Sequence, residues 1–347
     1  MTEIIVDCGR HAGIKRYQDL FQYMPHSWQK HFDRYEWLGS VELASNHIRV
    51  TDKLRHEPVP AYVPTPQPGQ RELIIPYQGL TVNGWADRVG AKIYLDALNC
   101  YAEENWICAT STLALVVSPH DPAWSAKLIR SRAATGTVSA VCIPLIPEML
   151  GTRYWDPIYE ACVEHNLPVI THFSGVEGSY VGAPSLSGGV HQSPLSRLVL
   201  MPHLAESNIA SLMFEGAFYR FPTLQILFAG FGFKWLPSLM RRMDQEWRNF
   251  RSDVPWVKDP PSTKVLNNVW LSSYPIGEVL DPQSWDSEFD ARLRQRIVFN
   301  SHAPFGHDTP ALLSEKLGPE WSSLLMRNGA RFLDLKNTEG ADARNYH

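Results

Sequence analysis

The chain has 347 residues, of which 44% are hydrophobic and 20% charged, and its formal net charge is -4. This composition is that of a globular protein and excludes a disordered or fibrous chain. The weak negative charge offers no basic field for a phosphate backbone, so nucleic acid is not expected as a partner. The N-terminal MTEIIVDCGR has no basic leader, and no apolar run approaches the ~18 residues of a membrane span, which predicts a cytoplasmic protein.

Short apolar runs rich in β-branched residues alternate with longer amphipathic stretches. In chain order, the expected strands are residues 3–8, 71–77, 112–118, 138–145, 167–173, 224–230, 268–274 and 296–302. The expected helices between them are 90–107, 122–134, 154–166, 205–220, 233–250 and 282–293. Eight parallel strands with interleaved helices predict an α/β fold, a (β/α)8 TIM-like barrel, as one domain over 1–347. A doubly wound open sheet is the alternative, but no GxGxxG follows the first strand.

Residues 12–70 interrupt this alternation. The segment begins with an expected helix at 16–32 and ends in EPVPAYVPTPQPG, whose prolines exclude helix and favour extended chain. We expect an insertion after the first strand whose aromatic residues pack at the barrel rim. A free linker between two domains is the alternative.

The cysteines give no sign of a disulfide framework or a thiolate zinc site. They are odd in number and show no CxxC spacing. We expect them to be small core residues. The five are Cys8, Cys100, Cys108, Cys142 and Cys162.

Histidines occur at the ends of three expected strands: His11 after the first, His172 in the fifth and His302 in the eighth. The carboxyl ends of the strands of such a barrel meet at one mouth, where the chemistry of these folds takes place. Neutral imidazole is a ligand for zinc, iron or nickel. A single histidine after a strand is more often a hydrogen-bonded structural residue. The shared position of the three favours a metal site.

Two further histidines could reach the same mouth. His203 lies in a loop after the fifth strand, where it could face either the site or solvent, and His307 follows the eighth strand. Asp308 precedes Thr309-Pro310 and is expected to cap the next helix. No GxSxG elbow and no P-loop sequence is present, so a serine hydrolase or a nucleotide-binding protein of those types is excluded.

Four phrases of the chain resemble the amidohydrolase-related family, the metal-dependent barrel hydrolases grouped with aminocarboxymuconate-semialdehyde decarboxylase. They are YWDPIYEACVEHNLPVITHFSG (154–175), SLMFEGAFYRFPTLQILFAGFGFKWLPSLMRRMDQEW (211–247), VWLSSYPI (269–276) and IVFNSHAPFGHD (297–308). Together with the first strand they span about half of the chain in the order of the family. The resemblance implies the barrel fold and a divalent metal, zinc being expected here.

The resemblance also implies a ligand pattern from which this chain departs. Relatives carry an Asp or His two residues before His11, a histidine matching His172, a His or Glu just after the sixth strand, and an Asp in a Ser-Asp-Tyr-Pro-His phrase. The chain keeps both histidines. At the other positions it has Gly9, Ala229, His302 for the Asp, Ala303 for the Tyr and Phe305 for the last His.

Two hypotheses follow from these departures. In the first, the chain is a hydrolase or non-oxidative decarboxylase for a small aromatic or carboxylated substrate. The metal is held by His11, His172 and His302, and His302, His203 or His307 handles protons. In the second, it is a catalytically impaired subunit that pairs with an intact paralogous amidohydrolase. A homodimer or such a heteromer is the expected assembly.

Overall fold

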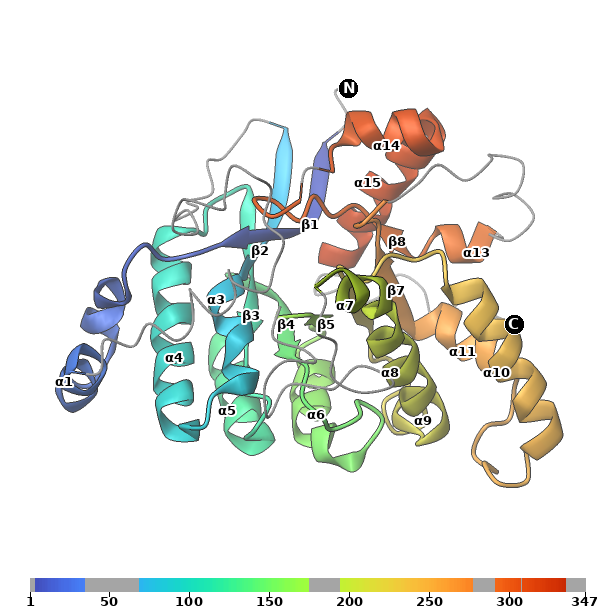
Figure 1. The fold of residues 1–347 in the computed structure, drawn as a ribbon, viewed down its shortest axis with the longest axis horizontal. Coiled ribbons are helices and arrows are strands. Elements are labelled where there is room, and N and C mark those ends of the chain that lie inside the picture. The colour runs from blue at the N-terminus through green and yellow to red at the C-terminus, as the bar shows by residue number, and fades with distance from the viewer. Residues whose placement is uncertain (1–3, 35–68, 175–193, 277–290, 307, 335–347) are drawn as a thin grey trace.

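Eight parallel strands form one sheet in the order β1 to β8, which curls into a barrel (Figure 1). The computed structural model describes residues 4–34, 69–174, 194–276, 291–306 and 308–334. The strands are β1 (Ile5–Ala12), β2 (Gln70–Pro76), β3 (Ser111–Val116), β4 (Val138–Pro144), β5 (Val169–His172), β6 (Ile226–Ala229), β7 (Val269–Ser272) and β8 (Ile297–Val298). The predicted (β/α)8 barrel is therefore confirmed.

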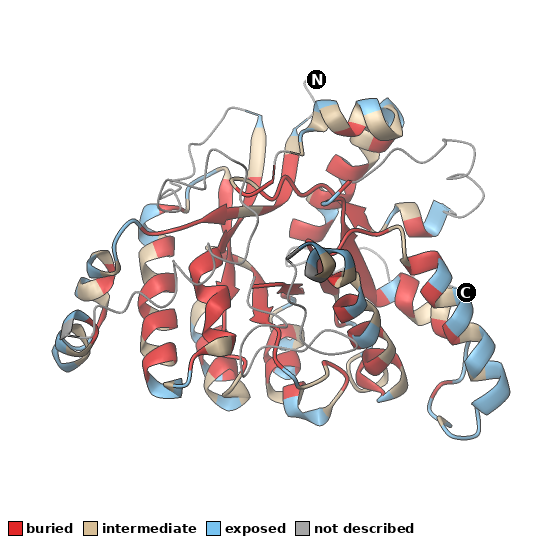
Figure 2. Cartoon of the chain, in the orientation of Figure 1, coloured by how far each residue is buried: buried red, intermediate tan, exposed pale blue. Residues whose placement is uncertain are grey.

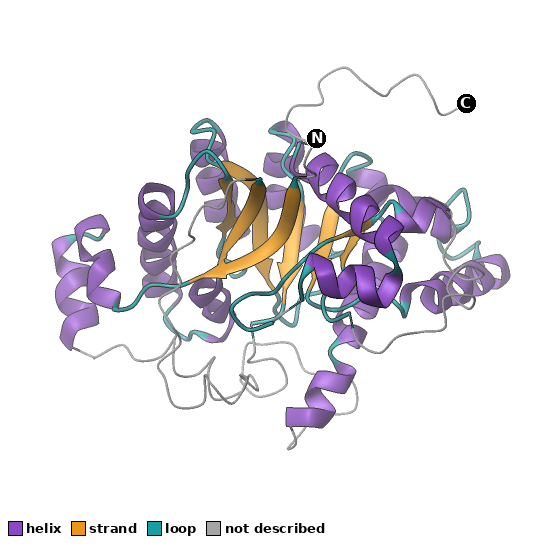
Figure 3. Cartoon of the chain, turned by 90° about the horizontal axis from the view of Figure 1, so that it is seen from above, coloured by secondary structure: helices purple, strands orange, loops and turns teal. Residues whose placement is uncertain are grey.

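Helices surround the strands on the outside (Figure 3). They are η1 (Tyr17–Tyr23), α1 (His26–Arg34), α3 (Tyr77–Leu80), η4 (Thr81–Gly84), α4 (Arg88–Asn105), α5 (Pro122–Ala133), η5 (Arg153–Trp155), α6 (Asp156–Glu164), α7 (Pro194–Leu200), α8 (Pro202–Phe214), α9 (Ala217–Arg220), α10 (Leu236–Phe250), α11 (Pro261–Asn268), α13 (Ala291–Arg294), α14 (Pro310–Leu317) and α15 (Pro319–Leu333). None of these described helices is long and apolar enough to cross a membrane.

The core lies inside the barrel and between the strands and the helices. The inward halves of the helices and nearly all strand residues are buried (Figure 2). Every residue of β3, β5, β6 and β7 is buried, as expected for parallel strands covered on both faces. This is why the strands read in the sequence as short continuous apolar runs.

Several element boundaries differ from the sequence prediction. The helix expected at 205–220 is broken by Gly216, which has a left-handed backbone with φ of 82°, and becomes α8 and α9. The helix expected at 16–32 is divided into η1 and α1 before Pro25. Most of the helix expected at 282–293 lies outside the described residues. The cap of α14 was predicted wrongly, because the side chain of Thr309 accepts a hydrogen bond from Leu312 N, whereas Asp308 accepts one from Ile276 N.

The described beginning of the 12–70 insertion packs on the outside of the barrel. Leu20, Met24 and Phe32 are buried, and Tyr23 donates a hydrogen bond to Glu104 of α4. Residues 35–68, including the proline-rich stretch, lie outside the described part of the chain. The placement of the whole insertion at the rim, and the single-domain assignment, stay predictions.

The five cysteines are free thiols. Cys8, Cys142 and Cys162 are buried, as predicted, whereas Cys100 is partly exposed and Cys108 is exposed. Cys108 is therefore not a core residue. It lies in the turn between α4 and β3, where the amphipathic pattern of the helix has ended.

A buried carboxylate ties the first strand to the last. Backbone hydrogen bonds join Cys8 N to Phe299 O (2.9 Å) and His11 N to Ala303 O (2.8 Å). Between them, Asp7 accepts from the backbone N–H groups of Gly9 and Ser301 at 3.1 Å each and from the Ser301 hydroxyl. Because Asp7 is only 4% exposed, these donors replace the water that its carboxylate loses on folding.

Replacement of Asp7 by alanine is expected to destabilise the fold by about 3 kcal/mol or more, because three buried donors lose one acceptor group. The free energy of unfolding from urea titration measures this. Asp334→Ala is the matched control, since Asp334 pairs with Arg71 at 2.7 Å at a partly exposed site, and its loss should cost less than about 1 kcal/mol. Equal costs for the two variants would contradict the role given to Asp7.

Candidate metal centre

Three histidines from separate strands meet at the carboxyl end of the barrel. His11 lies near the end of β1, His172 ends β5, and His302 follows β8. All three are buried, with 1%, 1% and 3% exposure. One nitrogen of each ring can be chosen so that all three nitrogens lie within 4.8 Å of one another. Among the described residues, no cysteine or carboxylate belongs to this group.

Two of the three nitrogen pairs lie near the spacing that a shared ion requires. His302 Nδ1 lies 2.9 Å from His11 Nε2 and 3.3 Å from His172 Nε2. A tetrahedral metal with N–metal bonds of 2.0–2.1 Å separates its ligand nitrogens by about 3.4 Å. The His172 pair already fits this spacing, and the His11 pair needs a shift of about half an ångström.

A hydrogen bond on the side of a ring away from the centre fixes which of its nitrogens faces the centre. His172 Nδ1 is hydrogen-bonded to the carbonyl of Phe173, so Nδ1 carries the proton and Nε2 presents its lone pair to the centre. No described residue bonds His11 Nδ1, although that atom is buried. The arrangement therefore resembles a ligand set in which one imidazole is already oriented by an outer hydrogen bond.

The chain turns out of β8 at His302. The residue has a left-handed backbone with φ of 53°, which is uncommon for a residue other than glycine and is held by its surroundings. Its N–H donates to Asn300 Oδ1 at 2.7 Å. Its ring stacks on Tyr274, with centroids 4.1 Å apart, and lies parallel to the ring of His172. These contacts direct the imidazole back over the barrel.

The centre is electrically neutral in the absence of an ion. Burial lowers the pKa of His172 to about 4. Burial, with mutual repulsion among the rings, also holds the pKa of His11 and of His302 well below the ordinary value. All three imidazoles are therefore uncharged near pH 7, and the uncharged form is the one that binds metals.

The position two residues before His11 is filled by an amide from the segment after β8. A Cβ atom built on Gly9 would lie 2.3 Å from Asn300 Nδ2, so Asn300 occupies the space of the side chain that Gly9 lacks. The Asn300 side chain is fully buried, and its Nδ2 has no partner among the described residues. Gly9 and Asn300 therefore fit against each other, one residue providing the space that the other fills.

The other departures from the family pattern are also explained by packing. Ala229 is buried at the end of β6 and is followed by Gly230, where a Cβ would come within 3.1 Å of His172 Nε2. Phe305 packs its ring against His11 (5.5 Å) and Tyr77 (4.9 Å). Apolar groups thus lie beside the imidazoles at positions where the family resemblance implies further donors.

Of the two remaining sequence candidates, only His203 is described, and it does not join the centre. His203 is exposed as the second residue of α8, and it does not belong to the group of three. His307 lies outside the described residues. Sequence reasoning missed Asn300 and Tyr274, which hold His302. The signal for Asn300 was present, as a polar residue just before Ser301-His302 at the end of an apolar strand.

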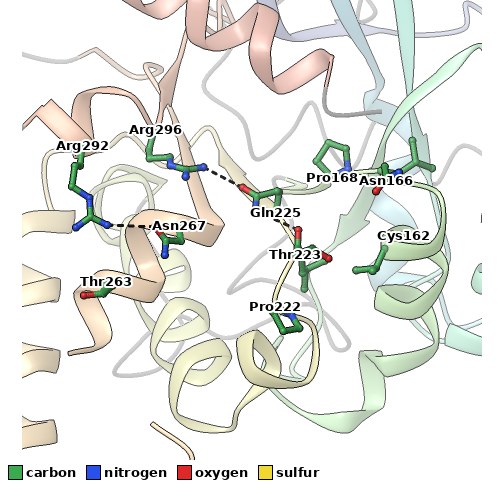
Figure 4. Close-up of a pocket in the computed structure, with 13 residues that line it drawn as sticks. Cys162, Asn166, Pro168, Pro222, Thr223, Gln225, Thr263, Asn267, Arg292 and Arg296 are labelled. Atoms are coloured by element: carbon green, nitrogen blue, oxygen red, sulfur yellow. Dashed lines mark hydrogen bonds between the residues drawn. The ribbon is translucent and has the colours of Figure 1, made fainter. Parts of the chain in front are cut away.

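A cavity of about 890 Å³ lies at the opposite end of the barrel, where β5, β6 and β8 begin (Figure 4). Pro168, Gln225 and Arg296 each precede one of these strands and line it. None of the three clustered histidines lines this cavity. Since barrel chemistry is placed at the carboxyl ends of the strands, the cavity is not the candidate site.

The chain belongs to the amidohydrolase family, because the family model named Amidohydrolase matches residues 99–315, which is more than half of the sequence. This confirms the resemblance inferred from the four phrases. The matched region contains His172 and His302 but begins after His11. A search of the curated proteins found no match.

Solved structures share the fold at low sequence identity. An amidohydrolase of Mycobacterium avium subsp. paratuberculosis K-10 is 17% identical, with a TM-score of 0.68, over 97% of this chain and 100% of that one. The 5-carboxyvanillate decarboxylase of Novosphingobium aromaticivorans DSM 12444, solved with bound manganese, is 14% identical (TM-score 0.59; 96% and 97%). A Rhizobium 2,6-dihydroxybenzoate decarboxylase is 15% identical (TM-score 0.57; 96% and 99%).

Metal-free protein is expected to lose stability as the pH falls below the ordinary histidine pKa of about 6.5. A histidine with a depressed native pKa binds protons more readily in the unfolded chain, so stability present above pH 6.5 is lost on acidification. With the His172 pKa at about 4, this residue alone should remove about 2 kcal/mol between pH 7.5 and pH 5. Urea unfolding in EDTA measures the loss.

His172→Asn is the matched comparison for this pH effect. The variant cannot take up the proton, and comparing it with wild type cancels the opposite contributions of Asp7 and Glu72, whose pKa values are raised by burial. It should lose less stability than wild type over the same pH range. Identical pH profiles for wild type and His172→Asn would show that the buried imidazole is not held neutral.

A double-mutant cycle tests the Gly9–Asn300 pair. Gly9→Ala should cost about 1–3 kcal/mol of stability in wild type, because the added methyl group overlaps the Asn300 amide. In an Asn300→Ala background the same change should cost much less, giving a coupling energy of about 1 kcal/mol or more. Additive costs, measured by urea unfolding, would mean that the two residues do not compete for space.

Proposed function

We propose that this chain is a metal-dependent hydrolase or non-oxidative decarboxylase of small carboxylated substrates, with His11, His172 and His302 as its metal ligands. The observation that carries the proposal is the convergence of three buried, uncharged imidazoles from β1, β5 and β8, with nitrogens within 4.8 Å. His11 Nδ1 is buried and has no hydrogen-bond partner among the described residues.

The donor set favours zinc. Three imidazoles without a carboxylate match the ligands of zinc sites that keep a fourth position open, while manganese prefers oxygen donors. The manganese bound to the Novosphingobium decarboxylase is a property of that protein. A bound divalent ion would acidify a water molecule or polarise a carboxylate oxygen at the open position.

The charge of the centre favours an anionic substrate. Neutral ligands leave the full +2 charge of the ion, which attracts a carboxylate or hydroxide as the fourth ligand. The apolar rings of Phe173, Phe305 and Tyr274 around the imidazoles exclude water and strengthen this attraction. The names of the decarboxylases with the same fold agree with a carboxylated aromatic substrate.

The proton-handling role stays with His302 and His307. His302 is at the position of the family's carboxylate, and His307 follows it closely in sequence. The exposed side chain of His203 does not support the role predicted for it. The hypothesis of an impaired partner subunit gains no support from the comparisons, and the intact trio of imidazoles favours a chain that holds its own ion.

Purified protein should hold about one zinc ion per chain, and His302→Ala should weaken zinc binding at least about a hundredfold, because it removes one of three ligands. Metal analysis after dialysis against a weak chelator measures both. His203→Ala is the matched control and should retain the metal. Wild-type protein without metal, or His302→Ala with the full amount, would contradict the proposal.

A further inference from the structure

Gly230 places its backbone against the metal-facing nitrogen of His172. It is the first residue after β6, and the preceding Ala229 pairs with His172 in the register of the sheet. A Cβ atom built on Gly230 would lie 3.1 Å from His172 Nε2. This nitrogen presents its lone pair to the centre, because Nδ1 is hydrogen-bonded to the carbonyl of Phe173. Residue 230 therefore borders the candidate metal centre directly.

The backbone of Gly230 is fixed in this place. The residue is buried, its φ of 88° is in the left-handed region, and its N–H donates to Ser272 Oγ at 2.8 Å. Gly232, in the same loop, has a similar φ of 68°. A Cβ atom built on Gly232 would, however, lie 3.6 Å from Pro275 O, an ordinary contact. The backbone conformation alone thus accounts for the glycine at 232, whereas residue 230 is also constrained by the nearby imidazole.

The distance between this Cβ position and His172 Nε2 is close to the spacing of two ligands on one ion. Donor atoms on a tetrahedral zinc ion lie about 3.4 Å apart, and the Cβ atom at residue 230 would lie 3.1 Å from the nitrogen. Three imidazoles leave one position of such an ion open. A group that lies against the Cα atom of Gly230 is therefore within reach of an ion held by His172.

The ring of Phe173 approaches the same place from the other side. Its centroid lies 4.6 Å from that of His172 and 5.6 Å from that of His302. A Cβ atom at residue 230 would come within 2.6 Å of Cε1 of this ring, which is too close for two carbon atoms that are not bonded. A methyl group on residue 230 would therefore collide with the ring and crowd the metal-facing nitrogen of His172.

We infer that Gly230 sets the size of the group that completes the candidate metal centre, and that the carboxylate of the substrate binds beside its Cα atom. The inference rests on the proposed function, since the three histidines hold the ion. A carboxylate at the open position needs room for its second oxygen and for the carbon to which it is attached. A residue larger than glycine would take that room, so Gly230 is a specificity-determining residue.

The test compares a broad and a thin anion on cobalt-substituted protein, whose visible absorption changes with the ligands of the ion. Benzoate is the broad anion and azide the thin one. Gly230→Ala should bind benzoate about tenfold or more weakly than wild type, because the added methyl group crowds the fourth ligand. Azide should lose less affinity because it is narrower. The zinc and cobalt contents should equal those of wild type, because the three imidazoles are unchanged.

Gly232→Ala is the matched control for backbone strain. Its new side chain meets the same left-handed conformation but makes only an ordinary contact with Pro275 O, so its anion affinities should equal those of wild type. A loss of benzoate affinity as large as that of Gly230→Ala would ascribe the effect to the backbone and overturn the inference.

The remaining outcomes separate this inference from the metal assignment. Protein that holds no metal would overturn the proposed function. Metal-loaded wild type that binds neither anion, a Gly230→Ala variant that binds benzoate as wild type does, or loss of the ion from that variant would overturn only the inference. If Gly230→Ala does not fold, Phe173→Leu tests the same contact from its other side. It should shift the preference toward benzoate over azide, and an unchanged preference would overturn the inference.

Discussion

The buried carboxylate of Asp7 holds together the two strands on which the candidate site depends. It joins β1 to the segment after β8, and these two carry His11 and His302. One oxygen accepts from Gly9 N and Ser301 N, and the other accepts from the Ser301 hydroxyl. Burial of this carboxyl group raises its pKa. The junction of β1 with the segment after β8 is therefore stable only because the hydrogen-bond donors of Gly9 and Ser301 are already in place. The register between β1 and β2 shifts between Asp7 and Arg10, a bulge that re-aims the residues after it.

Among the described residues, no carboxylate belongs to the candidate site, in contrast to the pattern that the family resemblance implies. Three neutral imidazoles are buried together, and burial lowers the pKa of each of them. Repulsion from the neighbouring rings lowers the pKa of His11 and His302 further. A carboxylate in this place would need a cation beside it at all times. With imidazoles alone, the centre tolerates the absence of an ion at little electrostatic cost and leaves the charge of a bound ion for the substrate.

Where the family resemblance implies further metal ligands, this chain has residues that fill space. Asn300 fills the volume above Gly9, and Phe305 covers His11. Gly230 leaves space beside His172 Nε2. These residues therefore pack closely against one another, as residues of a protein interior do. The outcome is that the rings of Phe173 and Phe305 lie against the imidazoles.

The sequence by itself determined the class of fold and the strands that bear the histidines. Strand periodicity is a local property, because a strand buried on both faces requires a continuous apolar run, and the family phrases located His172 and His302 within it. Boundaries were less predictable where single residues override periodicity, as at Gly216 and His302, whose backbones are left-handed.

Only the tertiary structure decided which of the candidate residues meet. The sequence left open whether His203 faces the site or solvent, and the structure shows it exposed on α8, whereas His302 is buried against Tyr274. Asn300 fills the space beside Gly9, and these two residues lie near opposite ends of the chain. Asn83, which follows β2, bonds residues after β4 and β5. Contacts of this kind arise from closure of the barrel, and no local pattern encodes them.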